Sequence, residues 1–353
     1  AGNGSVVKNG GGTLILTGTS NYTGGTTVNA GTLQGTTTSL QGNIVNNAAV
    51  IFDQSITGIY AGNMTGTGTL TKNGTGKVTI TGTSTIGGGT TINDGGFAVN
   101  GNLTSNVTLN GGILSGAGNI NGDITQNGGE IAPGNSIGTI TINGNYTVRH
   151  GILEFEINSN GQNDKINVVG AGHKATLQGG TIEVLALAGT YRPNSTYTLI
   201  SASGGVVGTF DRTTSNLAFL TPTLSYDTNN VYISLALASN AFASAGQTQN
   251  QQAVGRALDI TAASGNVDGI VTVMANLPGG AGAPALQALS GQPYADFGTL
   301  NTRASQLFMN TVGRQMATER GAGLGGSQRV ALAETCIIAC DTSTPSRFSA
   351  WVA

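Results

Sequence analysis

The sequence has few charged residues, few aromatic residues and few prolines. Charged residues make up 8% of its 353 residues, aromatic residues make up 5%, and proline occurs 7 times. The formal net charge is −2 and no run of basic residues occurs, so nucleic acid is not an expected partner. A low net charge at ordinary hydrophobicity also argues against intrinsic disorder. No apolar stretch reaches the roughly 18 residues of a membrane-spanning helix.

Motifs for catalysis, cofactors and metals are also missing. The only histidines, His150 and His173, stand in turn-like contexts and have no Cys or His neighbours at metal-binding spacing. No Gly-x-Ser-x-Gly elbow appears between a strand and a helix, and no glycine-rich run continues into Lys-Ser or Lys-Thr as a phosphate-binding loop does. We therefore expect no catalytic residue, no cofactor, no metal site and no enzymatic activity.

Glycine, in contrast, is abundant. It accounts for 58 residues, and threonine, asparagine, valine, isoleucine and leucine fill much of the remainder. Because Gly does not recur at every third position, the sequence is not collagen. Thr, Val and Ile suit pleated strands, whereas Gly and Asn suit tight turns at positive φ. The composition therefore predicts many short strands joined by many turns.

An internal repeat organises the first hundred residues. Residues 8–33 align with residues 72–97 at a constant offset of 64, beginning with Lys-Asn-Gly in both copies. We interpret this offset as about three coils of roughly 21 residues. The pattern predicts an all-β fold, a right-handed parallel β-helix (solenoid) of about ten coils. An array of antiparallel hairpins is the alternative, because Asn-Gly pairs also mark hairpin turns.

Changes in composition and in strand length divide the sequence further. We assign residues 1–129 to the β-helix stem. From 130 to 237 the strands lengthen, and most of the Tyr and Phe residues lie between 146 and 242, which predicts that 130–237 is a better packed C-terminal cap. A solenoid needs such a cap because its last coil would otherwise expose core and strand edges. Residues 238–320 are rich in alanine and predict a helical linker segment.

Helical spacing gives this segment more detail. Further helices are expected near 284–289 and 300–319. Residues 321–346 begin with a glycine-rich stretch and predict a flexible linker. The first helix is expected to present one apolar face, formed by Ala253, Ala257, Leu258 and Ile260.

The order of these motifs resembles a known family. The unit at 8–33, with Gly-Gly-Thr-Thr-Val-Asn near its end, resembles the passenger-associated transport repeat of classical (type Va) autotransporters of Gram-negative bacteria. The unit at 72–97 is a second copy. Residues 132–140 resemble the junction before the autochaperone region, and 191–237 resemble the end of that region. Residues 250–259 resemble the segment that precedes the membrane barrel.

The resemblance implies a location and partners. The protein is expected at the bacterial cell surface or outer membrane, with release after cleavage as an open alternative. The implied partners are its own C-terminal outer-membrane β-barrel and the barrel assembly machinery; host-cell or neighbouring-cell molecules are further candidates. Residues 347–353 resemble the start of the first barrel strand, so we expect a truncated protein. The helix at 300–319 would then occupy or approach the barrel pore.

Cys336 and Cys340 are the only cysteines. Their spacing is too wide for the common redox motif, and two ligands are too few for zinc. In an exported protein we favour a local disulfide between them over two free thiols.

Three functions stay open. The first is a non-enzymatic stem that supports vectorial folding and secretion, with residues 130–237 folding first, and that presents a distal region. The second is an adhesin or self-association module whose Thr and Asn ladders contact host or neighbouring cells. The third is a β-helix carbohydrate-active enzyme, which needs Glu154 and Glu156, or two distant acids, to converge in a groove as acid and base. These two glutamates share a strand face, and we favour a solvated face with Phe155 pointing inward.

Overall fold

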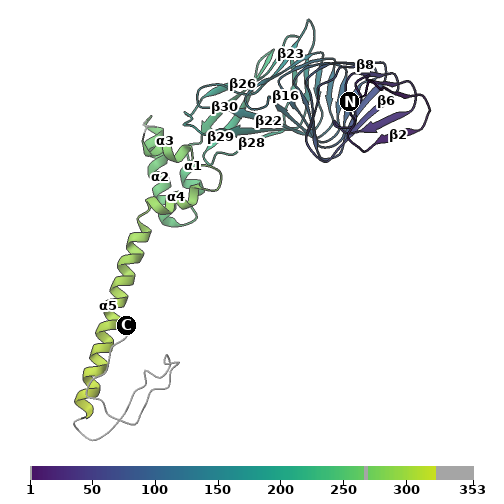
Figure 1. Ribbon diagram of the computed structural model, residues 1–353. Coiled ribbons are helices and arrows are strands. Elements are labelled where there is room, and N and C mark those ends of the chain that lie inside the picture. Colours follow the sequence, from purple (N-terminus) through teal and green to yellow (C-terminus); the bar gives the residue numbers. More distant parts are fainter. Residues whose placement is uncertain (1, 266–268, 323–353) are drawn as a thin grey trace, which may run out of the picture. The chain divides into compact units, whose positions relative to one another are not determined.

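The computed structural model describes residues 2–265 and 269–322 (Figure 1). The chain divides into two compact units, Ala1–Ala285 and Leu286–Ala353. A parallel β-solenoid followed by helices confirms the fold class expected from the sequence. Its coils run in turn through a 12-stranded, a 10-stranded and an 8-stranded sheet. Neighbouring coils pair in parallel, so the alternative of an antiparallel hairpin array is wrong for the stem.

Each sheet stacks strands from successive coils in chain order, except that β30 lies between β26 and β29 in the 12-stranded sheet. The 12-stranded sheet contains β1 (Val6–Lys8), β3 (Thr26–Val28), β5 (Ile44–Asn46), β8 (Met64–Gly66), β11 (Thr83–Ile86), β14 (Asn102–Thr104), β17 (Asn119–Asn121), β20 (Thr139–Asn143), β23 (Lys165–Val169), β26 (Thr196–Ala202), β30 (Asn230–Leu237) and β29 (Leu220–Tyr226). The 10-stranded sheet contains β2 (Thr13–Leu16), β4 (Thr32–Gly35), β6 (Ala49–Asp53), β9 (Thr69–Asn73), β12 (Thr90–Ile92), β15 (Val107–Leu109), β18 (Ile124–Gln126), β21 (Tyr146–Val148), β24 (Ala175–Gln178) and β27 (Val206–Thr209). The 8-stranded sheet contains β7 (Gly58–Tyr60), β10 (Lys77–Ile80), β13 (Gly96–Val99), β16 (Ile113–Gly116), β19 (Glu130–Pro133), β22 (Ile152–Ile157), β25 (Thr181–Ala186) and β28 (Arg212–Ser215).

The size of a coil follows from which residues pair. Thr90 pairs with Val107, and Val107 pairs with Ile124, so these coils are shorter than the roughly 21 residues expected. Later coils are longer, since Thr139 pairs with Lys165. The longer coils carry the longer strands, such as β22 and β26.

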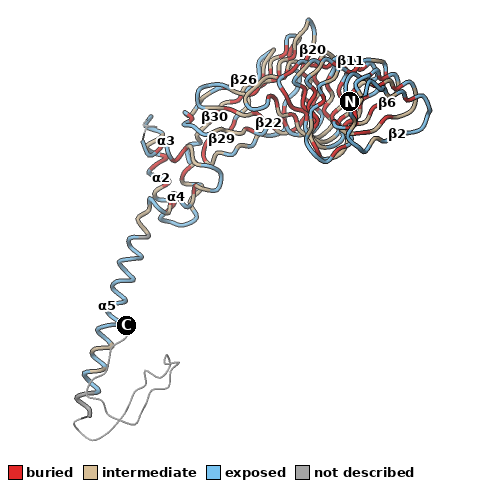
Figure 2. The backbone as a smooth tube through the Cα atoms, viewed as in Figure 1, coloured by how far each residue is buried: buried red, intermediate tan, exposed pale blue. Residues whose placement is uncertain are grey.

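The core is a set of apolar columns inside the coils. Along most strands, buried residues alternate with less buried residues (Figure 2). Because parallel neighbours are in register, the inward residues stack on one another from coil to coil. One column of the 8-stranded sheet is fully buried along its length, and it consists of Val78, Phe97, Leu114, Ile131, Leu153 and Ile182.

The two transport-like repeats lie on different faces. The copy at 8–33 contributes β1 and β3 to the 12-stranded sheet and β2 and β4 to the 10-stranded sheet. The copy at 72–97 contributes β9 and β12 to the 10-stranded sheet and β10 and β13 to the 8-stranded sheet, so its aligned strands lie one face further on, and its β11 adds a strand to the 12-stranded sheet. The offset of 64 therefore corresponds to three coils plus one face, not to three coils.

At its C-terminal end the solenoid is closed by antiparallel strands. β26 pairs antiparallel with β30, and β30 pairs antiparallel with the edge strand β29. Pro222 lies in β29 and has no N–H to donate, which discourages further pairing at this edge.

Helices follow the last strand, and a ring contact and hydrogen bonds join them to the C-terminal end of the solenoid. They are α1 (Ala241–Ala245), α2 (Gln249–Ala263), α3 (Ile270–Ala275) and α4 (Gly282–Leu289). The ring of Phe219 contacts the ring of Phe242 of α1, with centroids 4.7 Å apart. The side chain of Asn276, just after α3, accepts from the Tyr191 N–H at 2.7 Å and donates to the Tyr191 carbonyl at 3.0 Å. These contacts tie the helices to the last coils.

The expected apolar face of the first helix is wrong. In α2 the residues Ala253, Ala257 and Ile260 are exposed, and of the four expected positions only Leu258 is buried. The buried side instead carries Gly255 and Asp259. Gly255 allows close approach to α1, and the Asp259 carboxylate accepts hydrogen bonds from the N–H groups of Phe242 and Ala243 at 3.0 Å each. A polar capping role therefore sets the orientation of α2.

The second unit contains the long helix α5 (Gln292–Ala322). It begins earlier than the expected 300–319. Its large apolar side chains are exposed, for example Phe297 at 63% and Phe308 at 62%. Cys336, Cys340 and residues 347–353 lie outside the described residues, so their predicted disulfide and strand stay predictions.

Candidate functional site

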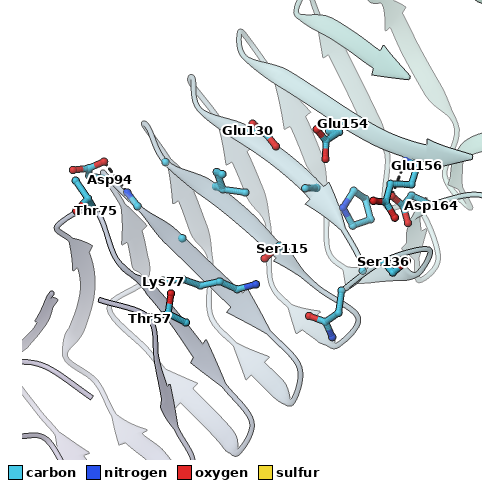
Figure 3. A pocket seen from close by; sticks show the side chains of 18 residues that line it. Thr57, Thr75, Lys77, Asp94, Ser115, Glu130, Ser136, Glu154, Glu156 and Asp164 are labelled. Atoms are coloured by element: carbon cyan, nitrogen blue, oxygen red, sulfur yellow. Dashed lines mark hydrogen bonds between the residues drawn. The ribbon is translucent and has the colours of Figure 1, made fainter. Parts of the chain in front are cut away.

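A groove of about 830 Å³ lies on the outer face of the 8-stranded sheet (Figure 3). Carboxylates gather at one end of it, where Glu130 of β19, Glu154 and Glu156 of β22, and Asp164 lie. Lys77 of β10 lines the other part. The segment 133–136 forms one side of the groove at its acidic end.

The stacking of coils produces this concentration of charge. Glu154 is the direct register partner of Glu183 on β25, so their side chains leave the sheet one strand spacing apart, about 4.8 Å. Burial raises the pKa of Glu154, and the charges of Glu183 and Glu156 add to the rise. Burial likewise raises the pKa of Glu130, with smaller contributions from Glu154 and Glu183. The carboxylates thus act on one another as like charges, which favours their protonated forms.

Asp164 is the most enclosed of these acids, with 2% of its surface exposed. One of its carboxylate oxygens accepts from the Gly138 N–H at 2.7 Å, and the other accepts from the Glu156 N–H at 2.8 Å. Burial nevertheless raises its pKa to about 7, because desolvation outweighs these two bonds. Asp164 therefore joins the loop at 133–138 to β22.

The structure brings together the two glutamates that sequence reasoning singled out. Glu154 and Glu156 are half-buried and line the groove, and Phe155 points inward as expected. Glu130, Asp164 and Glu183 were not expected there. Their places follow only from the coil lengths, which set which distant residues become neighbours.

The convergence of carboxylates that a carbohydrate-active enzyme needs is therefore present, but other features count against that function. No Trp, Tyr or Phe is among the residues lining the groove, so no aromatic platform for a sugar ring is present there. Both oxygens of Asp164 are already occupied by backbone N–H groups. Within residues 2–265 and 269–322, no three His, Cys, Asp or Glu side chains are placed to hold a metal ion.

The two histidines, which the sequence places in turns, differ in solvent exposure. His150 is exposed, and His173 is half-buried with Nδ1 2.7 Å from the Val169 carbonyl. Neither lines the acidic groove.

A lysine corner is common to the two transport-like repeats. The Lys72 ammonium is fully buried and donates to the carbonyls of Asn73, Gly74 and Asp94 at 2.7, 2.6 and 3.0 Å. In the first copy, Lys8 donates to the carbonyls of Gly10 and Ala30. These partners match the repeat alignment residue for residue, except that Asn73 has no counterpart bond. Burial lowers the pKa of Lys72.

Two polar rows run along the outside of the 10-stranded sheet. One row is a threonine column of six register partners, Thr71, Thr91, Thr108, Thr125, Thr147 and Thr176. Beside it runs an asparagine ladder in which each side chain donates to the amide oxygen of the preceding coil, and it contains Asn73, Asn93, Asn110 and Asn127. Arg149 extends the ladder by donating to Asn127 at 2.9 Å. The rows expose hydroxyls and amides at the spacing of the coils.

Sequence comparison identifies the repeats. The passenger-associated-transport-repeat family matches residues 6–34 and 70–99, which confirms the resemblance found in the sequence. The extracellular serine protease of Serratia marcescens is 30% identical over 219 residues, covering 59% of this chain and 21% of that protein. The adhesin BmaC autotransporter of Brucella suis biovar 1 (strain 1330) is 57% identical over 53 residues, covering 14% of this chain and 2% of that protein. The chain thus spans about a fifth or less of the length of these relatives.

Across residues 2–265 and 269–322, no helix combines the length and apolar character that a membrane crossing needs.

Proposed function

Because the chain is an autotransporter passenger segment, we propose that it forms a non-enzymatic stem that supports folding during secretion and presents a distal region. Such segments are surface-exposed or extracellular. In this proposal the C-terminal side of the chain leads toward its own translocator barrel, and α5 belongs to that connection.

The closure of the C-terminal end of the solenoid carries the proposal. At the C-terminal end, antiparallel strands and bonded helices close the stack. A coil that folds onto this end finds unpaired strand edges and an apolar column ready to receive it.

Growth from the cap is favourable without an outside energy source. Each added coil buries apolar side chains on the coil before it, worth about 25 cal/mol per Å² of apolar surface removed from water. It also pairs three further strand edges, as the registers of successive coils show. Residues 130–237 would therefore fold first and template the coils of the stem.

Refolding with pulses of protease tests this order. Peptides from 139–237 are expected to become protected before peptides from 26–121, and deletion of 130–237 is expected to leave the stem open to protease. A matched control removes 93–109, one coil by the pairing of Ile92 with Leu109, and keeps the register of the remainder. A stem that stays resistant without 130–237, or that becomes protected first, contradicts the proposal.

Adhesion through the 10-stranded sheet is the second candidate. The threonine column and the asparagine ladder form a regular polar face, and one relative is named an adhesin. The candidate predicts that the purified chain self-associates or binds cells, and that the double variant Thr91→Lys/Thr125→Lys abolishes this. The control is Thr65→Lys/Thr104→Lys on the 12-stranded sheet, which is expected to have no effect. Equal loss in both variants would remove this face as the adhesive surface.

A further inference from the structure

Glu156 and Asp164 form a close carboxyl pair at the junction of short and long coils. Two hydrogen bonds join these residues. The Asp164 N–H donates to the Glu156 carbonyl at 2.8 Å, and the Glu156 N–H donates to the side-chain carboxylate of Asp164 at 2.8 Å. Figure 3 shows the two side chains next to each other at the acidic end of the groove. Asp164 ends the turn before β23, the first strand of a longer coil.

Among the described residues, one carboxylate oxygen of this pair has no hydrogen-bond donor. Glu156 Oε2 is enclosed, and within the described part of the chain it has no hydrogen-bond partner. Both oxygens of Asp164 already accept backbone N–H groups. An enclosed carboxylate oxygen without a donor is costly, and a neighbouring carboxyl supplies a donor as soon as one of the two is protonated.

The surrounding charges favour such a proton. Glu154 lies on the same strand as Glu156, Glu130 lies on β19, and Glu183 lies on β25. The cation that lines the groove is Lys77 on β10, at its other end. Lys165 follows Asp164 directly but belongs to β23 of the 12-stranded sheet. Among the described residues, the charged groups that act on Asp164 most strongly are thus Glu156 and Glu154.

We propose that Glu156 and Asp164 share one proton, and that its loss loosens the loop 133–138 at the stem–cap junction. With the proton present, one carboxyl donates to the other, Glu156 Oε2 is satisfied, and Asp164 holds Gly138 against β22. Without it, two enclosed carboxylates repel each other beside Glu154. The bond from the Gly138 N–H itself favours the charged carboxylate, so the loop loosens because repulsion from Glu156 displaces Asp164.

The direction of the pH dependence follows from the raised pKa. In the unfolded chain Asp164 titrates near 3.8, and in the folded chain burial raises its pKa to about 7. Between these values the folded state binds more protons than the unfolded state, so stability falls as pH rises. The contribution of the pair is complete below pH 4 and is lost as the pH passes about 7.

Thermal unfolding of the whole chain between pH 5.5 and pH 8 tests the proposal. The midpoint of the wild type is expected to fall by at least about 2 °C over this range. Glu156→Gln supplies a permanent N–H donor in place of the proton, and it is expected to flatten the profile. The control Asp53→Asn changes an exposed acid that accepts from Gln34 at 2.9 Å, and it is expected to keep the wild-type slope. A Glu156→Gln profile as steep as the wild type overturns the proposal.

A measurement on the wild type needs no variant. Hydrogen exchange of peptides covering 133–140, corrected for intrinsic rates, is expected to be at least about tenfold faster at pH 8 than at pH 6. Peptides from the column around Leu114 serve as the internal reference, because they are buried and carry no acidic side chain. Equal protection of 133–140 at both pH values overturns the proposal even if Glu156→Gln fails to fold.

Discussion

Lys8 and Lys72 hold equivalent places in the two transport repeats, yet their ammonium groups close corners on different faces of the solenoid. Lys8 ends β1 of the 12-stranded sheet, and Lys72 lies in β9 of the 10-stranded sheet. Each ammonium binds carbonyls of its own turn and one carbonyl of the next coil, from Ala30 or Asp94. The lysine corner is therefore a local structure that forms on two different faces of the solenoid.

The lysine corner is expected to stabilise the stem. Lys72→Met keeps the length of the buried stem but removes the donor for three carbonyls, so the free energy of unfolding is expected to fall by about 2–3 kcal/mol. Urea titration of the whole chain measures the change. Lys174→Met removes an exposed lysine and should change the midpoint little. Equal effects of the two substitutions would mean that the corner bonds contribute nothing.

The repeat could be found in the sequence, but its geometry could not. Identity at Lys-Asn-Gly shows that two segments share a local structure, and it says nothing about which face they occupy. Coil length depends on how many residues each corner takes, and these corners differ: Thr90 to Val107 is a short coil and Thr139 to Lys165 a long one. For the same reason, the sequence singled out Glu154 and Glu156 as strand neighbours, while their meeting with Asp164 across a turn was not visible.

The face of α2 shows a second limit of sequence patterns. Apolar spacing favoured Ala253, Ala257 and Ile260, but contact with α1 is decided by a glycine and an aspartate. A hydrophobicity pattern gives no weight to Gly255, and the charged Asp259 argues against a buried helix face. Their roles depend on the N–H groups of α1, which belong to another segment of the chain.

Adding one methyl group at this contact is expected to separate the two helices. In Gly255→Ala the new Cβ would lie 2.6 Å from the Ala243 N and Cα, so α1 and α2 must shift, at a cost of about 1–3 kcal/mol. Limited proteolysis should then cut within 238–265 earlier than in the wild type. Gly313→Ala in α5 meets nothing within 4 Å and is expected instead to favour its helix by up to about 1 kcal/mol. Unchanged proteolysis of Gly255→Ala would contradict the packing of α1 on α2.

The asparagine ladder is expected to add stability coil by coil. Asn110 donates to Asn93 at 3.1 Å and accepts from Asn127 at 3.0 Å, so Asn110→Ala removes two exposed hydrogen bonds. The expected loss is about 1 kcal/mol, measured as the shift in urea midpoint. Asn160→Ala, on an exposed turn outside the ladder, is the control. A loss of stability no larger than that of the control would show that the ladder does not stabilise the fold.

Like-charge contact between Glu154 and Glu183 is expected to destabilise the folded chain at neutral pH. The two residues are direct register partners, and burial followed by the charges of Glu183 and Glu156 raises the pKa of Glu154. A raised pKa means that the folded state pays for ionisation above it, so Glu154→Gln should raise the urea midpoint at pH 7.5. Near pH 4 the carboxyl is largely protonated in both states, and the gain should shrink. Because each substitution removes the same repulsion, Glu154→Gln and Glu183→Gln combined should gain less than the sum of the two single gains. Strictly additive gains, or a gain at pH 4 equal to that at pH 7.5, would show that the two carboxylates do not act on each other.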